Sequence, residues 1–446
     1  MHLYGTMAIN AAGHLEIGGC DCTELAQHFG TPLYVLDESE FRHRCRILRD
    51  SLAKECPGSE VVFAGKSLLV AALCRILAQE NLGLDVVSGG ELYTALQSGF
   101  PAHRIFMHGN NKSQSELRMA LESGVGRIVV DNFLELDQLA QLARAQHRTA
   151  DILLRVTPGI EAHTHAYVKT GQVDSKFGFT MENGQALAAA KRALSLPNIN
   201  LMGFHCHIGS QIFELEPFQD AAVALAELVA QTRDLTGQVL PELDLGGGFG
   251  IRYHDQERPP ALDGYASAIR AGLSQACAKH SLPFPRVIIE PGRAISGEAG
   301  TTLYSVGSIK EIPAVRTYLS VDGGMGDNPR TALYGAKYSA LIANRADQEP
   351  DTLVSVAGKY CESGDMLIWD VQLAAPRPGD ILAVFCTGAY NYSMASNYNR
   401  LPRPAMVLVC DGEADLIVRR ETYADVMAND IIPKRLAPEN KACRAG

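Results

Sequence analysis

Residues 61–79 read VVFAGKSLLVAALCRILAQ, a short apolar run followed by a longer stretch with apolar side chains at helical spacing. The run Val61–Lys66 has the length and composition of a strand buried on both faces. The window Leu68–Gln79 is typical of an amphipathic helix. Because parallel strands need a crossover connection, a strand followed at once by a helix is the unit from which parallel sheets are built.

The same alternation recurs along the chain. We expect seven further strands, at Leu84–Ser88, Arg104–Gly109, Arg127–Asn132, Ile152–Pro158, Leu201–Ile208, Glu242–Gly248 and Val287–Gly292. Helical windows lie between them, at Glu91–Gln97, Ser115–Leu121, Leu134–Ala143 and Phe218–Leu235. Eight such units over roughly 230 residues predict a (β/α)8 barrel of the TIM type, which typically needs about 250.

The pattern changes after Pro291. Helical spacing gives way to short strand-like runs between Gly and Pro turns, at Leu303–Ile309, Thr317–Val321, Leu353–Val356, Ile381–Phe385 and Met406–Cys410. This pattern predicts a C-terminal antiparallel β-sandwich or barrel-like domain that also takes in the strand-like N-terminal segment. The expected boundaries are 33–295 for the barrel, and 1–32 together with 296–446 for the β domain.

Composition narrows the class of protein. The 446 residues are 46% hydrophobic and 20% charged, with a formal net charge of −10. This composition is that of an ordinary globular protein. The negative net charge argues against a nucleic-acid or anionic-membrane partner. Eleven cysteines without a regular frame predict reduced thiols and a cytoplasmic location. We expect no secretory signal, because the N-terminal residues MHLYGTMAIN lack a basic region and a long apolar region. We expect no membrane span, because no apolar run reaches the ~18–20 residues needed.

The chemistry-bearing residues follow the predicted strands, where active sites of such barrels form. Lys66 ends the first apolar run, and partial desolvation there would lower its pKa and free the amine for Schiff-base chemistry. The alternative is a lysine whose ammonium simply reaches solvent.

Two glycine-rich segments follow the last two strands. The backbone of Gly246–Gly248 can approach an anion closely, and barrels often bind phosphate here, although a flexible turn is the alternative. Glu290 could protonate a heteroaromatic nitrogen, and Arg293 could hold a substrate carboxylate by paired hydrogen bonds. A surface ion pair is the alternative for these two residues.

Histidines suggest a competing interpretation. His205 and His207 lie on one face of a strand, and His163 and His165 repeat the spacing. Neutral imidazoles are common metal ligands, so a metal-dependent barrel hydrolase stays open. No third ligand completes the set, and we expect His205 to be a packed core residue and His207 to stack on a ring.

In combination, these motifs resemble the diaminopimelate decarboxylase family, pyridoxal-phosphate enzymes (group IV decarboxylases) with an alanine-racemase-like barrel. The resemblance covers nearly the whole chain. It rests, in order, on Lys66, Leu84–Glu91, His108–Lys112, Asp174–Phe179, His205–Gln211, Gly246–Gly248, Glu290–Arg293, Cys361–Asp365 and Gly388–Tyr390.

The resemblance implies pyridoxal 5′-phosphate as cofactor and decarboxylation of meso-2,6-diaminopimelate to L-lysine and CO2, the last step of lysine biosynthesis. It implies that Lys66 holds the cofactor as a Schiff base, that His207 stacks on the ring and that Glu290 pairs with the ring nitrogen. The residues it assigns to the rest of the cofactor are Ser210, Gly246, Gly247, Gly248, Gly292, Arg293 and Tyr390.

The resemblance also implies a substrate site shared between two chains. It assigns the substrate to Arg293, Arg330, Tyr334, Glu362 and Tyr390, with Glu362 at the distal amine. Cys361 would protonate the carbanion. Cys361 and Glu362 would come from the other copy of a homodimer with active sites at the subunit interface.

Alternatives remain at this level. The chain could be a decarboxylase of the same fold that acts on ornithine, arginine or carboxynorspermidine. It could also be a catalytically inactive relative that only binds a partner. The chain also departs from the family pattern beside the lysine, where Gly65 replaces a bulkier residue and Ser67 replaces alanine.

Overall fold

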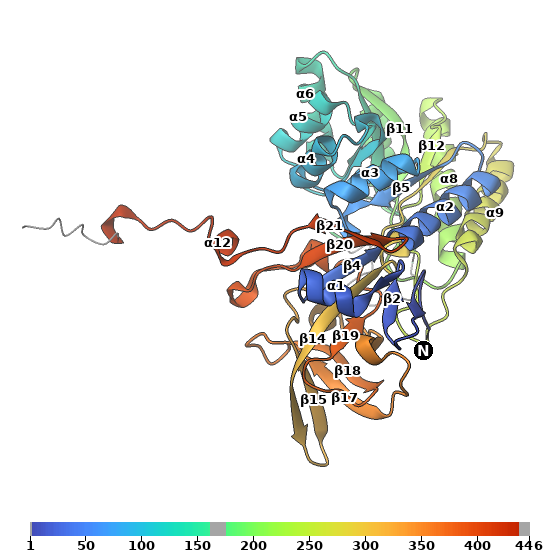
Figure 1. Ribbon diagram of the computed structural model, residues 1–446. Helices are drawn as coiled ribbons and strands as arrows, with labels where there is room; N and C mark the ends of the chain where they lie inside the picture. The colour runs from blue at the N-terminus through green and yellow to red at the C-terminus, as the bar shows by residue number, and fades with distance from the viewer. Residues whose placement is uncertain (1, 161–174, 437–446) are drawn as a thin grey trace, which may run out of the picture.

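The computed structural model describes residues 2–160 and 175–436. Eight parallel strands close into a barrel in the upper part of Figure 1. Around the barrel they follow chain order, and the last pairs with the first, so that all eight predicted strands are confirmed. Their bounds are β5 (Glu60–Ala64), β6 (Gly83–Val86), β7 (Ile105–Met107), β8 (Arg127–Val130), β9 (Ala150–Thr157), β11 (Ile199–His205), β12 (Glu242–Asp244) and β13 (Arg286–Ile289).

Helices cover the outside of the barrel. Side-chain caps start several of them: Ser88 accepts from the Glu91 amide, and Ser113 and Glu116 form a reciprocal capping box. The helix before β5 packs beside the one before β13 (Figure 1). The helices are α2 (Glu38–Glu55), α3 (Ala71–Gln79), α4 (Gly89–Gln97), α5 (Gln114–Ser123), α6 (Phe133–Ala145), α7 (Gln185–Leu194), α8 (Glu216–Thr236) and α9 (Leu262–His280).

The barrel is filled at its middle and closed by ion pairs at its N-terminal end. Val62, Phe106, Val129, Leu153 and Ile288 form a buried apolar cluster contributed by five of its strands. At the strand starts, buried Glu242 accepts hydrogen bonds from two arginines. These are Arg127, with Nε and Nη2 at 2.8 and 2.6 Å, and Arg286, with Nη1 at 2.8 Å. Arg127 and Arg286 at this end of the barrel therefore have carboxylate partners inside the protein.

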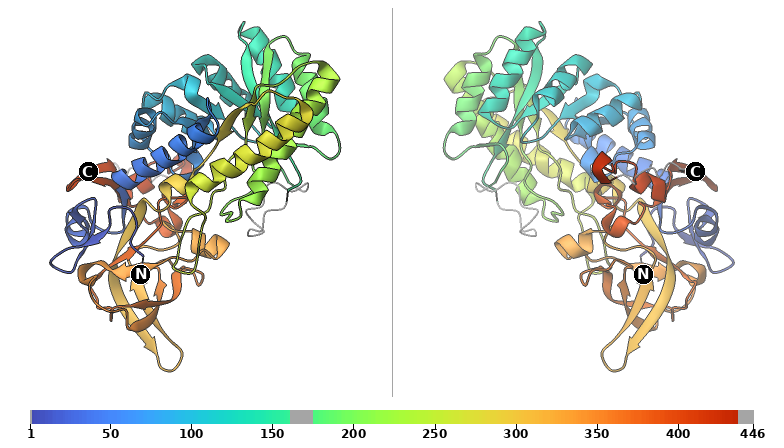
Figure 2. Two further views of the ribbon diagram at one scale, coloured as in Figure 1. Left: turned by 90° about the vertical axis from the view of Figure 1, so that its right-hand side faces the viewer. Right: turned by 90° about the vertical axis from the view of Figure 1, so that its left-hand side faces the viewer.

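The second body is a nine-stranded sheet, seen at the lower end of both views in Figure 2, with the hairpin of β14 and β15 at its tip. Most neighbouring strands are antiparallel, as predicted, but β15 with β17 and β20 with β4 are parallel pairs. The strands are β4 (Leu33–Asp37), β14 (Gly300–Ile312), β15 (Arg316–Val321), β16 (Ala340–Ile342), β17 (Thr352–Ala357), β18 (Met366–Leu373), β19 (Ile381–Val384), β20 (Ala405–Cys410) and β21 (Glu413–Val418).

The N-terminal boundary of the barrel differs from the prediction at residue 33. Strand β4 (Leu33–Asp37) pairs with β14 and β20, so it belongs to the β domain, and the barrel side begins with α2. Residues before it form a small separate sheet of β1 (Ala8–Ile9), β2 (Leu15–Ile17) and β3 (Cys20–Asp21), followed by α1 (Cys22–Phe29). This small sheet touches the β domain, because the Cys20 thiol donates to the Glu413 carbonyl.

The C-terminal part of the described chain leaves the body after β21 (Figure 1). It carries the short helix α12 (Tyr423–Val426) and exposes large apolar side chains, including Tyr423 and Ile431. Among the described residues, none of the helices combines the length and apolar character that a membrane crossing requires.

Candidate active site

A cavity of about 750 Å³ lies at the C-terminal ends of the barrel strands, where the β domain meets them. It gathers most of the residues singled out from the sequence. Of those, the lining includes Lys66, His207, Ser210, Gly247, Gly248, Glu290, Gly292, Arg293, Arg330, Tyr334 and Tyr390.

Lys66 stands on a tight turn, η1 (Gly65–Ser67), immediately after β5. The turn is fixed from both sides: the Ser67 hydroxyl donates to the Ala64 carbonyl at 2.8 Å, and the Tyr390 amide donates to the Ser67 carbonyl at 2.8 Å. A Cβ at Gly65 would lie 2.6 Å from the Asp85 carbonyl oxygen, so this backbone approach requires glycine.

The Lys66 side chain is exposed within the cavity. The chain turns at Gly65 instead of continuing as an apolar strand, and this turn follows β5 directly. The departure at Gly65 is thereby explained as a close contact between neighbouring strand ends.

Glu290 directly follows β13 and lies buried between two imidazoles. His108 Nε2 lies 2.6 Å from Glu290 Oε1, and His205 Nε2 lies 3.1 Å from Glu290 Oε2. Burial favours the neutral acid, but these two contacts outweigh it and hold the pKa of Glu290 well below its usual range. The carboxylate therefore stays charged at neutral pH.

A second carboxyl group, Asp244, neighbours Glu290. Burial, and then the charge on Glu290, raise the pKa of Asp244 well above its usual range, which favours its protonated form. His108, His205, Asp244 and Glu290 also have atoms close enough together to serve as metal ligands. The metal site considered from the sequence paired His205 with His207. Of these two residues, only His205 belongs to the cluster.

The glycine triplet after β12 forms a closely packed backbone cradle. A Cβ at Gly247 would lie 2.1 Å from the Glu290 carbonyl oxygen, and one at Gly248 would lie 2.4 Å from that of Gly209. The Gly247 amide donates to His207 Nδ1 at 3.3 Å, which fixes the ring. Backbone amides that line a cavity without side chains between them suit a phosphate group.

Two buried arginines line the same cavity. Arg293 starts α10 (Arg293–Ser296), and Arg330 starts α11 (Arg330–Tyr334) in the β domain. Each is only 7% exposed, and among the described residues no carboxylate lies within ion-pair distance of either guanidinium. Since burying an unpaired charge is costly, and the arginines at the opposite end of the barrel are paired, these two mark places for anionic groups of a ligand.

Cys361 and Glu362 lie outside the cavity of their own chain. Both are exposed, in the turn between β17 and β18. Their neighbours are residues of another loop: the Cys361 amide donates to Asn399 Oδ1 at 2.8 Å, and the Tyr398 hydroxyl donates to Glu362 Oε2 at 3.4 Å. Gly246, buried beside the cavity, is also absent from its lining.

Several lining residues were not singled out as site residues from the sequence. Tyr253 and Glu257 come from an irregular loop after β12, and Phe177 precedes the short strand β10 (Phe179–Thr180). Loop residues have no periodicity, so only the fold brings them to the site.

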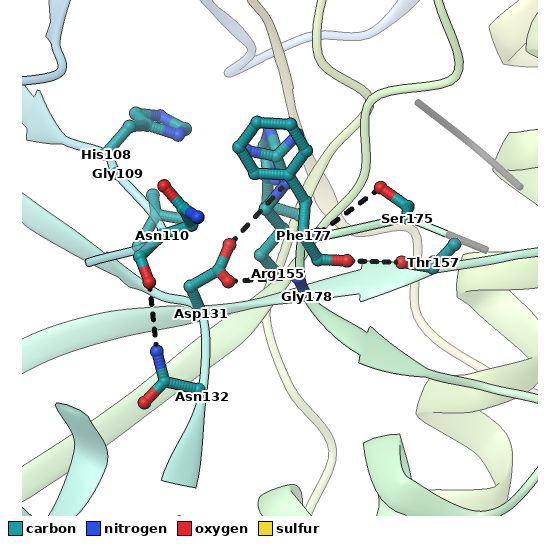
Figure 3. Close-up of polar contacts among 12 residues, drawn as sticks. His108, Gly109, Asn110, Asp131, Asn132, Arg155, Thr157, Ser175, Phe177 and Gly178 are labelled. Carbon is teal, nitrogen blue, oxygen red and sulfur yellow. Dashed lines mark hydrogen bonds and ion pairs between the residues drawn. The ribbon is translucent and has the colours of Figure 1, made fainter. Parts of the chain in front are cut away.

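Figure 3 shows how Phe177 is held. The Arg155 guanidinium carbon lies 4.1 Å from the centre of the Phe177 ring, and Thr157 Oγ1 donates to the Phe177 carbonyl at 2.8 Å. Asp131 accepts from the Gly178 amide at 3.1 Å and lies 4.0 Å from Arg155 Nε. The ends of β8 and β9 therefore fix one wall of the cavity. The sequence candidates His163, His165 and Asp174 lie outside the described residues.

Comparison with known proteins agrees with this geometry. Residues 39–297 match the family model described as pyridoxal-dependent decarboxylase, pyridoxal binding domain. Diaminopimelate decarboxylase of Bacillus subtilis (strain 168) is 52% identical over 431 residues, covering 97% of this chain and 98% of that one. The enzyme of the same name from Synechocystis sp. is 48% identical, covering 97% and 93%.

Solved structures show the same likeness. The diaminopimelate decarboxylase of M. jannaschii in co-complex with L-lysine superposes with a TM-score of 0.91 at 36% identity, covering 98% of this chain and 100% of that one. The Helicobacter pylori enzyme complexed with L-lysine gives 0.83 at 31% identity, covering 91% and 98%. On the family match, the near-complete coverage and the shared fold, the chain belongs to the diaminopimelate decarboxylase family of pyridoxal-dependent decarboxylases.

Proposed function

We propose that this chain removes CO2 from the D-centre of meso-2,6-diaminopimelate and releases L-lysine, with pyridoxal 5′-phosphate held by Lys66. The observation that carries the proposal is the content of one cavity: an amine at Lys66, a carboxylate at Glu290, and two buried guanidiniums at Arg293 and Arg330 without a carboxylate partner among the described residues. An amino acid with a second carboxylate, together with a phosphorylated cofactor, supplies the anions that those cations lack.

The residues fit the cofactor at each of its ends. Bound pyridoxal phosphate supplies the electron sink that stabilises the α-carbon when CO2 leaves. The Lys66 amine is the attachment point, and His207 is placed to lie against the ring. The phosphate fits the glycine cradle and the donors beside it, where Arg293 Nη2 donates to Ser210 Oγ at 2.8 Å and the Arg293 guanidinium carbon lies 5.0 Å from the Tyr390 ring centre.

Glu290 keeps a proton on the ring nitrogen. An ionised carboxylate favours the charged form of a nearby base, and the imidazoles of His108 and His205 hold Glu290 in that ionised form. Burial and the charge on Glu290 raise the pKa of Asp244, which favours the neutral form of this carboxyl group beside Glu290.

The far end of the substrate meets the arginines and Tyr334. A bidentate guanidinium–carboxylate pair gives geometric as well as electrostatic selection, which favours a substrate with a distal carboxylate over a simple diamine precursor. We infer that Glu362 meets the distal amine and that Cys361 delivers a proton to the α-carbon. Both belong to a second copy in this account, because they are exposed and outside the cavity of their own chain. The proposal therefore includes a homodimer with shared sites.

We also expect the enzyme in the cytoplasm. All ten cysteines that the structure describes are free, and nine of them are at least partly buried. A reducing compartment is where a chain with this many free thiols is normally found.

The proposed activity is tested by incubating the purified holoenzyme with meso-diaminopimelate, L-lysine or L-ornithine and measuring CO2. We expect CO2 release from meso-diaminopimelate with stoichiometric formation of L-lysine. Release from L-lysine and L-ornithine should be at most about a hundredth as fast, because neither has a distal carboxylate to bind Arg293 and Arg330. Release from ornithine without release from diaminopimelate would contradict the substrate assignment.

Replacing Glu290 by glutamine is expected to lower kcat about 100-fold, because glutamine keeps the shape but not the charge opposite the ring nitrogen. The pKa of Glu290 lies below its usual range, so the stabilising charge would be lost only as the pH falls well below 4.5. The loss in the variant should therefore be equal at pH 6.5 and pH 8.5 in a CO2 assay.

Asp244→Asn serves as the matched control for that change. Asparagine reproduces the protonated carboxyl, so the cost should be much smaller. If Asp244→Asn proved as damaging as Glu290→Gln, the assignment of the charge to Glu290 would be wrong.

Replacing Arg330 by alanine is expected to raise KM for meso-diaminopimelate at least about tenfold, because a charge-assisted contact with the distal carboxylate is lost. The cofactor absorbance should remain. The exposed Arg377 of the β domain supplies the control Arg377→Ala, for which KM should stay at the wild-type value. An unchanged KM in Arg330→Ala would remove this residue from the substrate site.

A further inference from the structure

Tyr253 connects the two buried arginines of the cavity. It follows the glycine-rich segment after β12 and is 5% exposed. Its hydroxyl oxygen accepts a hydrogen bond from Arg293 Nη1 at 2.5 Å and another from Arg330 Nη1 at 2.9 Å. One phenol oxygen therefore joins a guanidinium from the barrel to a guanidinium from the β domain.

The position of this phenol is fixed by its surroundings. The Tyr253 amide donates to Glu257 Oε2 at 2.7 Å, and Ser339 Oγ donates to the Tyr253 carbonyl at 3.2 Å. Its ring packs edge-on against Tyr338, with the ring centres 5.5 Å apart, and lies 5.0 Å from the Arg330 guanidinium carbon. The two backbone contacts and the Tyr338 ring therefore hold the phenol in place without the help of the arginines.

Two buried cations this close repel each other, and an oxygen between them offsets part of that repulsion. The oxygen also consumes one donor nitrogen of each arginine. The hydrogen bonds of Arg330 to other described residues all leave from Nη1, and Arg293 Nε is buried without a partner among the described residues. Arg293 Nε, together with Arg330 Nε and Nη2, is therefore left without a hydrogen bond to another described residue, and a carboxylate is the group that such donors match.

We propose that Tyr253 is a positioning residue that sets the spacing of Arg293 and Arg330, and so makes the enzyme select substrates with a carboxylate at the end remote from the reacting carbon. The inference rests on the proposed function, and it adds a determinant of specificity that comes from the loop after β12. Tyr253 does not take part in the bond-breaking step.

The test uses Tyr253→Phe, which removes only the oxygen and keeps the ring packing. In the holoenzyme, L-lysine retains the carboxylate that the arginines would bind, whereas cadaverine lacks it. We expect the inhibition constant of L-lysine to rise about tenfold, as for loss of a charge-assisted contact, and that of cadaverine to stay within about twofold. For meso-diaminopimelate, KM should rise by a similar factor while kcat changes little.

Tyr338→Phe is the matched control, because Tyr338 accepts from Arg330 Nη1 at 2.9 Å but makes no described contact with Arg293. Its effect on L-lysine binding should be clearly smaller. Equal effects of the two variants, or equal weakening of L-lysine and cadaverine by Tyr253→Phe, would overturn the bridging role. In that case wild-type CO2 release from meso-diaminopimelate would leave the proposed function standing, whereas its absence in the wild type would overturn both.

Discussion

Replacing Lys66 by alanine is expected to reduce CO2 release from meso-diaminopimelate to below about a thousandth of the wild-type rate, because a tethered amine acts at a very high effective concentration. The variant should also lose the visible absorbance of bound cofactor. The amine stands on a turn held by Ser67 and Tyr390, so removing it should leave the fold intact. Both readouts can be taken on one purified sample.

The control for this variant is Lys279→Ala, since Lys279 is an exposed lysine paired with Glu227 far from the cavity. It should keep wild-type activity and absorbance. A Lys66→Ala protein that retained a tenth of the rate would show that another group holds the cofactor.

Heterodimers test whether two chains share each site. A dimer of one Lys66→Ala chain and one Glu362→Gln chain, purified through two different tags, is expected to show about half of the wild-type activity, since two-fold symmetry gives one site with both groups intact. Each homodimer of a single variant should be nearly inactive. The physical reason is the exposure of Glu362 outside the cavity of its own chain.

A second heterodimer makes the result decisive. One wild-type chain paired with a chain carrying both substitutions should be nearly inactive, because each site then lacks one group. If Glu362 acted within its own chain, the two outcomes would be exchanged: the first heterodimer would be inactive and the second would keep about half of the activity.

The barrel was predictable because most of its strands lie in short apolar runs that have polar or glycine residues near their carboxyl ends, and most are then followed by a helix. The β domain was less so. Leu33–Asp37 is fully buried and directly precedes α2, so nothing local shows that it pairs with β14 and β20, which lie hundreds of residues away. Strand β18 was missed because it mixes buried residues with exposed Trp369 and Asp370.

The residues of the candidate site likewise fall into those that the sequence predicted and those that it did not. Residues at strand ends, such as Glu290 and the glycines of 246–248, were predictable because parallel strands bring their carboxyl ends together. Tyr253 and Phe177 come from irregular segments, where no periodicity marks a role. The exposure of Lys66 depends on the turn at Gly65, which is set by the neighbouring Asp85 carbonyl and is not visible in the local sequence.

The central claim is that Lys66 carries the cofactor in the cavity that Glu290 and the two arginines share. It is tested most directly by treating the holoenzyme with borohydride and mapping the modified peptide by mass spectrometry. The account predicts a pyridoxyl group on Lys66 and on no other lysine. A pyridoxyl group on a different lysine would contradict the assignment of Lys66. A colourless protein that gains no pyridoxyl group after pyridoxal 5′-phosphate and borohydride are added would contradict it as well.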